Sequence, residues 1–209
     1  MKKEEFELTK QELKILKKLN TEKKIQDFLN KLRINFEPEG DTCLSPRRVL
    51  RERRAHCIEG ALFACLCFKL AGEKAWLVDL KTTRDDFEHV LCVFKKHGKW
   101  GAVAKTNHAV LRYREPVYNS IRELVMSLFH EYFTDKGKKT LRSYSVPIDI
   151  FKNQGTGWIT SEDNLWEIHD YLDKVEHFKI LTRKQIAGLR KADKVEIQAG
   201  KIVEWEKKR

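Results

Sequence analysis

Long apolar runs are missing from this 209-residue chain. No run approaches the roughly 18 apolar residues that a membrane-spanning helix needs, and the first ten residues, MKKEEFELTK, lack the apolar core of a signal peptide. Cysteine is also scarce, because the chain has five, an odd number without framework spacing, which favours reduced thiols over disulfides. We therefore expect a cytoplasmic protein with no membrane partner.

The motifs of common nucleotide and metal sites are absent as well. The sequence has no G-x-x-x-x-G-K-[ST], no G-x-G-x-x-G, no H-E-x-x-H and no C-x-x-C. Cys65 and Cys67 lie two residues apart in one expected helix, so their side chains diverge and suit core packing better than metal binding. We expect neither a cofactor nor a metal.

Positive charge, in contrast, is in excess. The 42 Lys and Arg residues outnumber the 31 Asp and Glu residues and give a net charge of +11, which is typical of proteins that bind nucleic acid or anionic surfaces. Lysines scattered over solvated helix faces give the same total. Arginines also gather just before Cys57, at Arg47, Arg48, Arg51, Arg53 and Arg54. They either attract a carboxylate or phosphate to a neighbouring site or form the wet face of a short helix.

The stretch 53–72, RRAHCIEGALFACLCFKLAG, reads as a basic approach to a buried helix. Apolar residues recur at helical spacing from Cys57 onward, and Gly72 ends the pattern. Cys57 therefore lies in the first turn, where free backbone N–H groups and the helix dipole favour a thiolate. The alternative is that Cys57 is one more small core residue.

A histidine follows on the next element but one. After a short strand over 74–80, residues 89–104 read as a β-hairpin that His89 opens. A Cys-led helix followed by a His-led strand is the arrangement of a Cys–His pair, in which the imidazole keeps the sulfur nucleophilic. A third group should orient the imidazole, and Asn107, just past the second strand, is placed to do so.

These residues resemble a known family. The chain contains, in order, Cys57-Ile-Glu59-Gly-Ala, a helix ending in Ala71-Gly72, a strand, Glu88-His89-Val90 and Gly98-Lys-Trp100. This order is similar to that of the transglutaminase-like superfamily of cysteine enzymes, over roughly residues 40 to 150. The phrase WGAVAKTNHAVLRYREPVY also resembles a group of prokaryotic proteins in that superfamily.

The resemblance implies an α+β, papain-like core in which the Cys-led helix packs on an antiparallel sheet. It implies Cys57 as nucleophile and His89 as base, and it places Glu59 and Trp100 beside the substrate. One position departs from the pattern. The family's third residue is usually Asp, about four residues after the Trp of the second strand, and here Ala104 stands there. Asn107 or His108 is then the substitute.

The remaining segments frame this core. We expect a helical N-terminal segment at 1–40, the catalytic domain at 41–180 and a basic C-terminal extension at 181–209. The polar stretch 107–118 either walls a cleft or is a packed connecting loop, and we assign Arg112 there and Arg54 before the helix to substrate binding. The alternating residues Val195 to Trp205 predict a hairpin.

The function expected from these features is thiol-dependent acyl transfer on amide bonds, with a peptide or protein amide as substrate. Hydrolysis by a peptidase or amidase is expected over transfer to an amine, since water needs no binding site. The alternative is a transglutaminase-like domain that has lost catalysis and binds nucleic acid, which the charge of +11 suits.

Overall fold

The structure is a computed structural model, and it describes residues 6–38 and 40–206. The helices are α1 Lys10–Leu16, α2 Glu22–Asn30, α3 Pro46–Glu52, α4 Cys57–Leu70, α5 Ile121–Met126, α6 Ile150–Gln154, α7 Trp166–Lys174, α8 Arg183–Ala187 and α9 Lys194–Gly200, with 3-10 turns at Phe129–Glu131 and Gly157–Ile159. The strands are β1 Arg33–Ile34, β2 Arg54–Ala55, β3 Ala75–Lys81, β4 His89–Lys96, β5 Lys99–Val103, β6 Arg114–Tyr118, β7 Ser143–Ser145 and β8 His177–Lys179.

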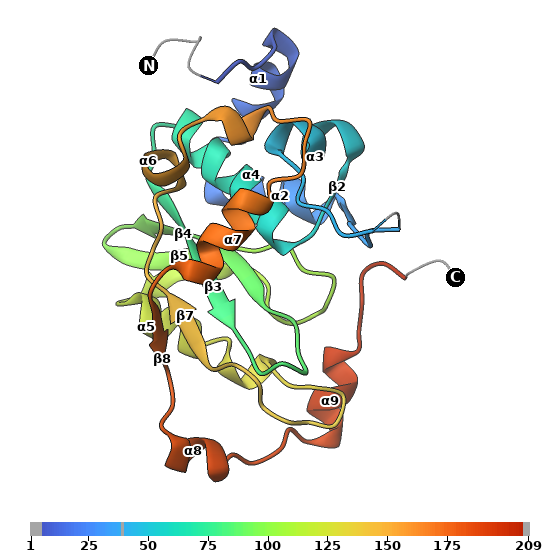
Figure 1. Ribbon diagram of the computed structural model, residues 1–209, viewed down its shortest axis with the longest axis vertical. Coiled ribbons are helices and arrows are strands. Elements are labelled where there is room, and N and C mark those ends of the chain that lie inside the picture. Colours follow the sequence, from blue (N-terminus) through green and yellow to red (C-terminus); the bar gives the residue numbers. More distant parts are fainter. Residues whose placement is uncertain (1–5, 39, 207–209) are drawn as a thin grey trace.

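An antiparallel sheet of six strands, in the order β6-β5-β4-β3-β7-β8, forms the centre of the fold (Figure 1). The expected hairpin is present, since β4 and β5 pair from Cys92 opposite Val103 to Lys96 opposite Lys99. A second sheet is a short parallel pair of β1 and β2, which places Arg33 beside Arg54. The mixed architecture and its antiparallel sheet confirm the expected α+β class.

Each face of the sheet has its own apolar core. Alternate residues of β4 point to opposite faces, so Val90, Cys92 and Phe94 join the core around α4, whereas Leu91 and Val93 join the core around α5. The described part of the N-terminal segment packs into the α4 core through Leu16, Ile25, Leu29 and Leu32.

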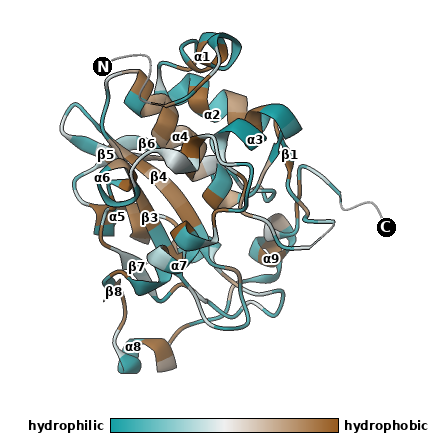
Figure 2. Cartoon of the chain, turned by 45° about the horizontal axis from the view of Figure 1, so that its top comes forward, coloured by the Kyte–Doolittle hydropathy of each residue, from teal (hydrophilic) through white to brown (hydrophobic). Residues whose placement is uncertain are grey.

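Helix α4 is the most deeply buried helix of the fold. Every residue from Ile58 to Phe68 is buried, and Figure 2 shows α4 and β4 as largely apolar. A helix that is apolar on all sides needs protein on all sides, and here the sheet, α2 and α3 provide it. The expected core packing of Cys65 and Cys67 is confirmed, since both are buried.

The expected hairpin over 195–205 is wrong. Residues Lys194–Gly200 form helix α9, because Asp193 and Glu196 make a reciprocal capping box at its start. The C-terminal extension therefore consists of two short helices and a final segment that reaches back to residues 107–109. Local capping outweighs the period-two pattern of Val195 and Ile197 there.

No helix among residues 6–38 and 40–206 combines the length and the apolar character needed to span a membrane.

Gly60 gives a test of how α4 packs. A Cβ on Gly60 would lie 2.6 Å from the Cβ of Lys105, which belongs to the stem of that side chain and cannot swing away. We predict that Gly60→Ala lowers the free energy of unfolding by about 1–3 kcal/mol through overpacking. Chemical denaturation measures it. Gly157→Ala is the control, because nothing lies within 4 Å of that position, and equal losses in both variants would contradict this packing.

Candidate active site

Cys57 is the first residue of α4, as expected, and its backbone N–H has no helical acceptor at that position. It differs from the other four cysteines, which are all buried, because it alone is partly exposed. Burial raises the pKa of Cys43 to about 12 and the pKa values of Cys67 and Cys92 well above the ordinary value. Among the five cysteines, Cys57 therefore combines partial exposure with a helix N-terminus.

Two imidazoles, those of His56 and His89, contact the sulfur of Cys57. Burial by itself would raise the pKa of the thiol, but hydrogen bonds to both imidazoles and their positive charges outweigh it and hold the pKa well below its ordinary value. The expected Cys–His pair is thus brought together. The second imidazole, His56, was not expected from the sequence.

His56 is held in a polar setting of its own. Its Nε2 lies 3.0 Å from the backbone oxygen of Thr42, 3.3 Å from Glu59 Oε1 and 3.4 Å from Glu37 Oε1. Burial opposes the charged imidazole, yet the hydrogen bond to Cys57 and the negative charges of Glu59 and Cys57 raise the pKa of His56 to about 9. His56 is therefore an imidazolium at neutral pH. Its Nε2 faces the oxygens of Thr42, Glu59 and Glu37, and the ring also contacts the Cys57 thiolate.

His89 has a different setting. It is the first residue of β4, as expected, and it is 7% exposed. Its Nε2 is buried and has no hydrogen-bond partner among the residues that the structure describes. This imidazole contacts the sulfur but has no fixed orienting group, which leaves one ring nitrogen available for proton exchange.

Glu59 does not contact a substrate, contrary to the expectation. Its side chain is 0% exposed, and its oxygens accept hydrogen bonds from the backbone of His56 and Leu44, both at 2.8 Å, and from the side chain of Asn35 at 3.1 Å. A buried carboxylate needs several donors to offset its lost hydration. Glu59 is therefore a structural anion that fixes the N-terminus of α4.

Asn107 lines the cleft but does not orient His89. Its Nδ2 donates to the backbone oxygen of Trp205 at 2.9 Å, and its Oδ1 accepts from the Trp205 N–H at 2.9 Å. His108, the other candidate, bonds through Nδ1 to the backbone oxygen of Gly200. Both side chains hold the C-terminal segment in place. The expected orienting role of Asn107 is therefore corrected to an anchoring role.

Ala104 is buried, and its backbone N and O both bond to Gln26. The adjacent Lys105 is 1% exposed and donates to the backbone oxygen of Leu32 at 2.6 Å. Burial lowers the pKa of Lys105 to about 8. The two residues that follow β5 therefore make hydrogen bonds that hold the fold together. Neither of them offers a carboxylate that could orient His89.

The three remaining candidates, Arg54, Trp100 and Arg112, lie outside the cleft lining. Arg54 pairs with Glu52 at 2.8 Å, Trp100 stacks edge-on against Trp76, and Arg112 pairs with Glu204 at 3.2 Å. Each side chain is occupied by a partner in the fold. The expectation that they bind substrate is therefore not supported by where they lie.

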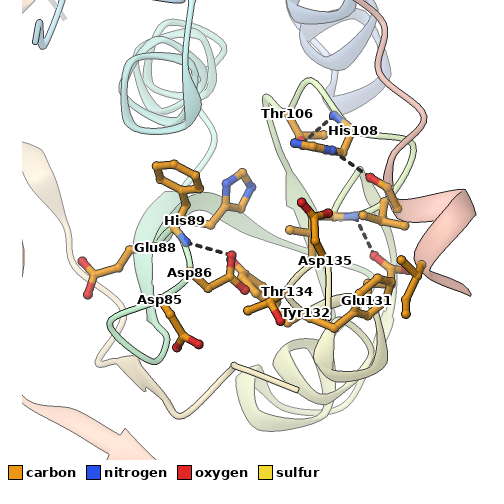
Figure 3. Close-up of a pocket in the computed structure, with 16 residues that line it drawn as sticks. Asp85, Asp86, Glu88, His89, Thr106, His108, Glu131, Tyr132, Thr134 and Asp135 are labelled. Carbon is orange, nitrogen blue, oxygen red and sulfur yellow. Dashed lines mark hydrogen bonds between the residues drawn. The ribbon is translucent and has the colours of Figure 1, made fainter. Parts of the chain in front are cut away.

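The cleft at Cys57 has a volume of about 760 Å³ and extends from His56 and Cys57 to α7. A second hollow of about 350 Å³ has His89 in its lining as well, and Figure 3 shows the residues that surround it. The two cavities share a rim of five residues, Phe87, Glu88, His89, Thr106 and His108. His89 lines both cavities, whereas Cys57 lines only the larger one.

Three carboxylates in the cleft region, Asp79, Glu88 and Asp173, are grouped closely enough to hold a metal ion. The ammonium of Lys81 contacts all three, at 3.0 Å from Asp79 and 2.5 Å from Glu88. Burial opposes that charge, but these partners raise the pKa of Lys81. An internal cation therefore already occupies this group and offsets one of its three negative charges.

Comparison of the sequence with models of known families gives no match, and comparison with curated proteins gives none either. The site therefore has to be interpreted from its own geometry.

His56 also gives a direct test of the site's electrostatics. We predict that its imidazole titrates near pH 9 and that Cys57→Ser shifts this pKa down toward the ordinary value of about 6.5, because removing the thiolate removes an anion that favours the imidazolium. Two-dimensional NMR of the imidazole nitrogens measures both values. Cys67→Ser, in the same helix but away from His56, should leave the titration unchanged, and an unshifted His56 in Cys57→Ser would contradict the contact.

Proposed function

We propose that this protein is a thiol-dependent acyl-transfer enzyme that acts on amide bonds, with hydrolysis as its main outcome. The observation that carries the proposal is the partly exposed Cys57 at a helix N-terminus with two imidazoles on its sulfur. Helix N-termini and neighbouring cations are the two general means by which proteins generate a thiolate. The transglutaminase-like resemblance, with its papain-like core, agrees with this chemistry.

The two imidazoles have different parts in the proposed reaction. His56, with its pKa near 9, stays charged and holds the thiolate at neutral pH. His89 exchanges the proton, because its setting lets it reach both cavities. In this scheme His56 keeps the sulfur of Cys57 ionised, and His89 is left to carry the proton during the reaction.

The reaction begins when the Cys57 thiolate forms a bond to the amide carbon and the carbonyl electrons move to oxygen. The Cys57 backbone N–H, free at the first helical position, is available to stabilise that oxyanion. In this scheme His89 holds the proton that the Cys57 thiol gave up, and the intermediate collapses when the C–N bond breaks and His89 gives this proton to the leaving nitrogen. Water then attacks the thioester carbon while His89 takes up the proton of the water, and the C–S bond breaks to release the acid and restore the thiolate.

The composition of the cleft argues against the nucleic-acid alternative at this position. Among the residues that line it, six are Asp or Glu and two are Lys or Arg. A phosphate backbone would meet repulsion there in spite of the net charge of +11. All five cysteines are free, which suits a protein in a reducing cytoplasm.

The thiolate can be tested without knowing the substrate. We predict that iodoacetamide alkylates Cys57 rapidly at pH 6, ahead of the four buried cysteines, and that His89→Ala and His56→Ala each slow this reaction about tenfold or more, because the thiol pKa rises when either imidazole is lost. Mass spectrometry of the modified peptides gives the rates. In both variants the rate should recover as the pH rises above about 8.5.

His169→Ala is the matched control, because His169 lines the same cleft but is not among the groups that lower the pKa of Cys57. A Cys57 that is inert at pH 6 in the wild type would remove the thiolate and the proposed function with it.

Turnover is the second test. On a mixture of peptide substrates with many acyl and leaving residues, Cys57→Ser should reduce amide cleavage by about 10⁴-fold or more, the scale seen when a covalent nucleophile is removed. The melting temperature should change little. Cys67→Ser serves as the control for a cysteine that only packs. Full activity of Cys57→Ser would show that cleavage does not depend on this sulfur.

A further inference from the structure

The hollow beyond His89 has an unusual charge for this chain. Five of its lining residues are acidic and none is Lys or Arg, although Lys and Arg outnumber Asp and Glu by 42 to 31 in the whole sequence. The acidic residues come from two segments that face each other across the opening (Figure 3), and they are Asp85, Asp86, Glu88, Glu131 and Asp135.

Three of these carboxylates already have a basic partner. Asp85 pairs with Lys138 at 2.9 Å, Glu131 with Arg114 at 2.6 Å, and Glu88 with Lys81. Asp86 and Asp135 have no basic partner among the residues that the structure describes. The surplus negative charge of the hollow therefore lies at Asp86, on the loop before β4, and at Asp135, on the segment after α5.

Two buried polar atoms in the same lining also lack partners. Tyr132 is 2% exposed and His89 is 7% exposed, and both Tyr132 Oη and His89 Nε2 have no hydrogen-bond partner among the described residues. Burial raises the pKa of Tyr132 well above the ordinary value, and the negative charges of Cys57 and Asp86 act in the same direction. Buried polar atoms without partners are costly, and the Tyr132 hydroxyl oxygen can accept a hydrogen bond from a ligand that carries donors.

An apolar side chain stands at the entrance. Phe87 is 90% exposed and lies on the rim that the hollow shares with the Cys57 cleft. An exposed ring beside surplus carboxylates suits a cation with an apolar stem, which can lie on the ring face while its charged end reaches the acids.

The position of the hollow identifies which part of a substrate would enter it. This inference rests on the proposed function. The acyl carbon must lie over Cys57, on the cleft side, and the leaving nitrogen must lie at His89, which protonates it. The hollow shares His89 with the Cys57 cleft, but Cys57 is not in the lining of the hollow. We infer that the hollow binds an arginine or lysine side chain of the substrate on the leaving-group side of the cleaved amide.

Binding is tested first, apart from catalysis, with argininamide as the probe and citrullinamide as its neutral counterpart of nearly the same shape. Calorimetric titration of the full chain should show argininamide binding at least tenfold more tightly than citrullinamide. NMR signals of Tyr132 and His89 should shift on binding. Equal affinity for the two amides would overturn the assignment.

The variants locate the site. Asp135→Asn, at an exposed residue, and Asp86→Asn should each weaken argininamide binding severalfold, and the double variant should weaken it at least tenfold. Asp163→Asn is the matched control, because Asp163 is also an exposed aspartate but lines neither cavity. If Asp86→Asn lowers the melting temperature, Asp135→Asn alone still decides. Unchanged binding in both variants would place the cation elsewhere and overturn the assignment.

Cleavage then separates this inference from the proposed function. Peptides randomised on the acyl side and carrying arginine, lysine, citrulline or glutamate just after the cleaved bond are compared by kcat/KM. A preference of at least tenfold for arginine and lysine over citrulline is expected, and glutamate should be poorest. Cleavage without that preference would reject the subsite and leave the enzyme, whereas binding of argininamide without any cleavage would reject the enzyme and leave the site.

Discussion

The site depends on one buried carboxylate, that of Glu59. Its oxygens accept hydrogen bonds from the N–H at the start of α4, from the Leu44 N–H and from the Asn35 side chain. Glu59 thereby joins the loop between β1 and α3 to the N-terminus of α4, where Cys57 lies. A buried anion is tolerated only when donors surround it, and here those donors are the backbone groups that must be fixed for His56 and Cys57 to meet. Without that charge, the contact between His56 and the Thr42 backbone oxygen would be the main side-chain link left between the loop and the start of α4.

The sheet sets the second half of the site. Residues inside β4 are committed to one core or the other by the alternation of the strand. His89, the first residue of β4, belongs to neither apolar core and lines both cavities. A side chain at such a strand end can serve two cavities, which no residue in the middle of β4 can do.

The sequence was sufficient for features that depend on neighbours in the chain. The helix that Cys57 begins and the strand that His89 opens both follow from local patterns. The hairpin expected over 195–205 failed because a capping box competes with alternation over so short a segment.

The roles of side chains whose partners lie far away in the sequence could not be predicted from local patterns. Asn107 looked free to orient an imidazole, but its partner is Trp205, 98 residues away. Glu59 looked like a substrate ligand because nothing local shows that it is fully buried. His56 was overlooked although it adjoins Cys57, since its role depends on Thr42 and Glu37, which only the fold brings near.

The bonds from Asn107 and His108 to the C-terminal segment also bear on how the protein is made. Chains emerge from the ribosome N-terminus first and begin to fold as they emerge. Cys57, His56 and His89 are all synthesised long before Trp205, yet the wall of their cleft at residues 107–108 is held by the backbone at 200–205. The residues of the Cys–His pair are thus synthesised before the segment that holds the wall of their cleft, so the enclosure is completed only by residues translated later.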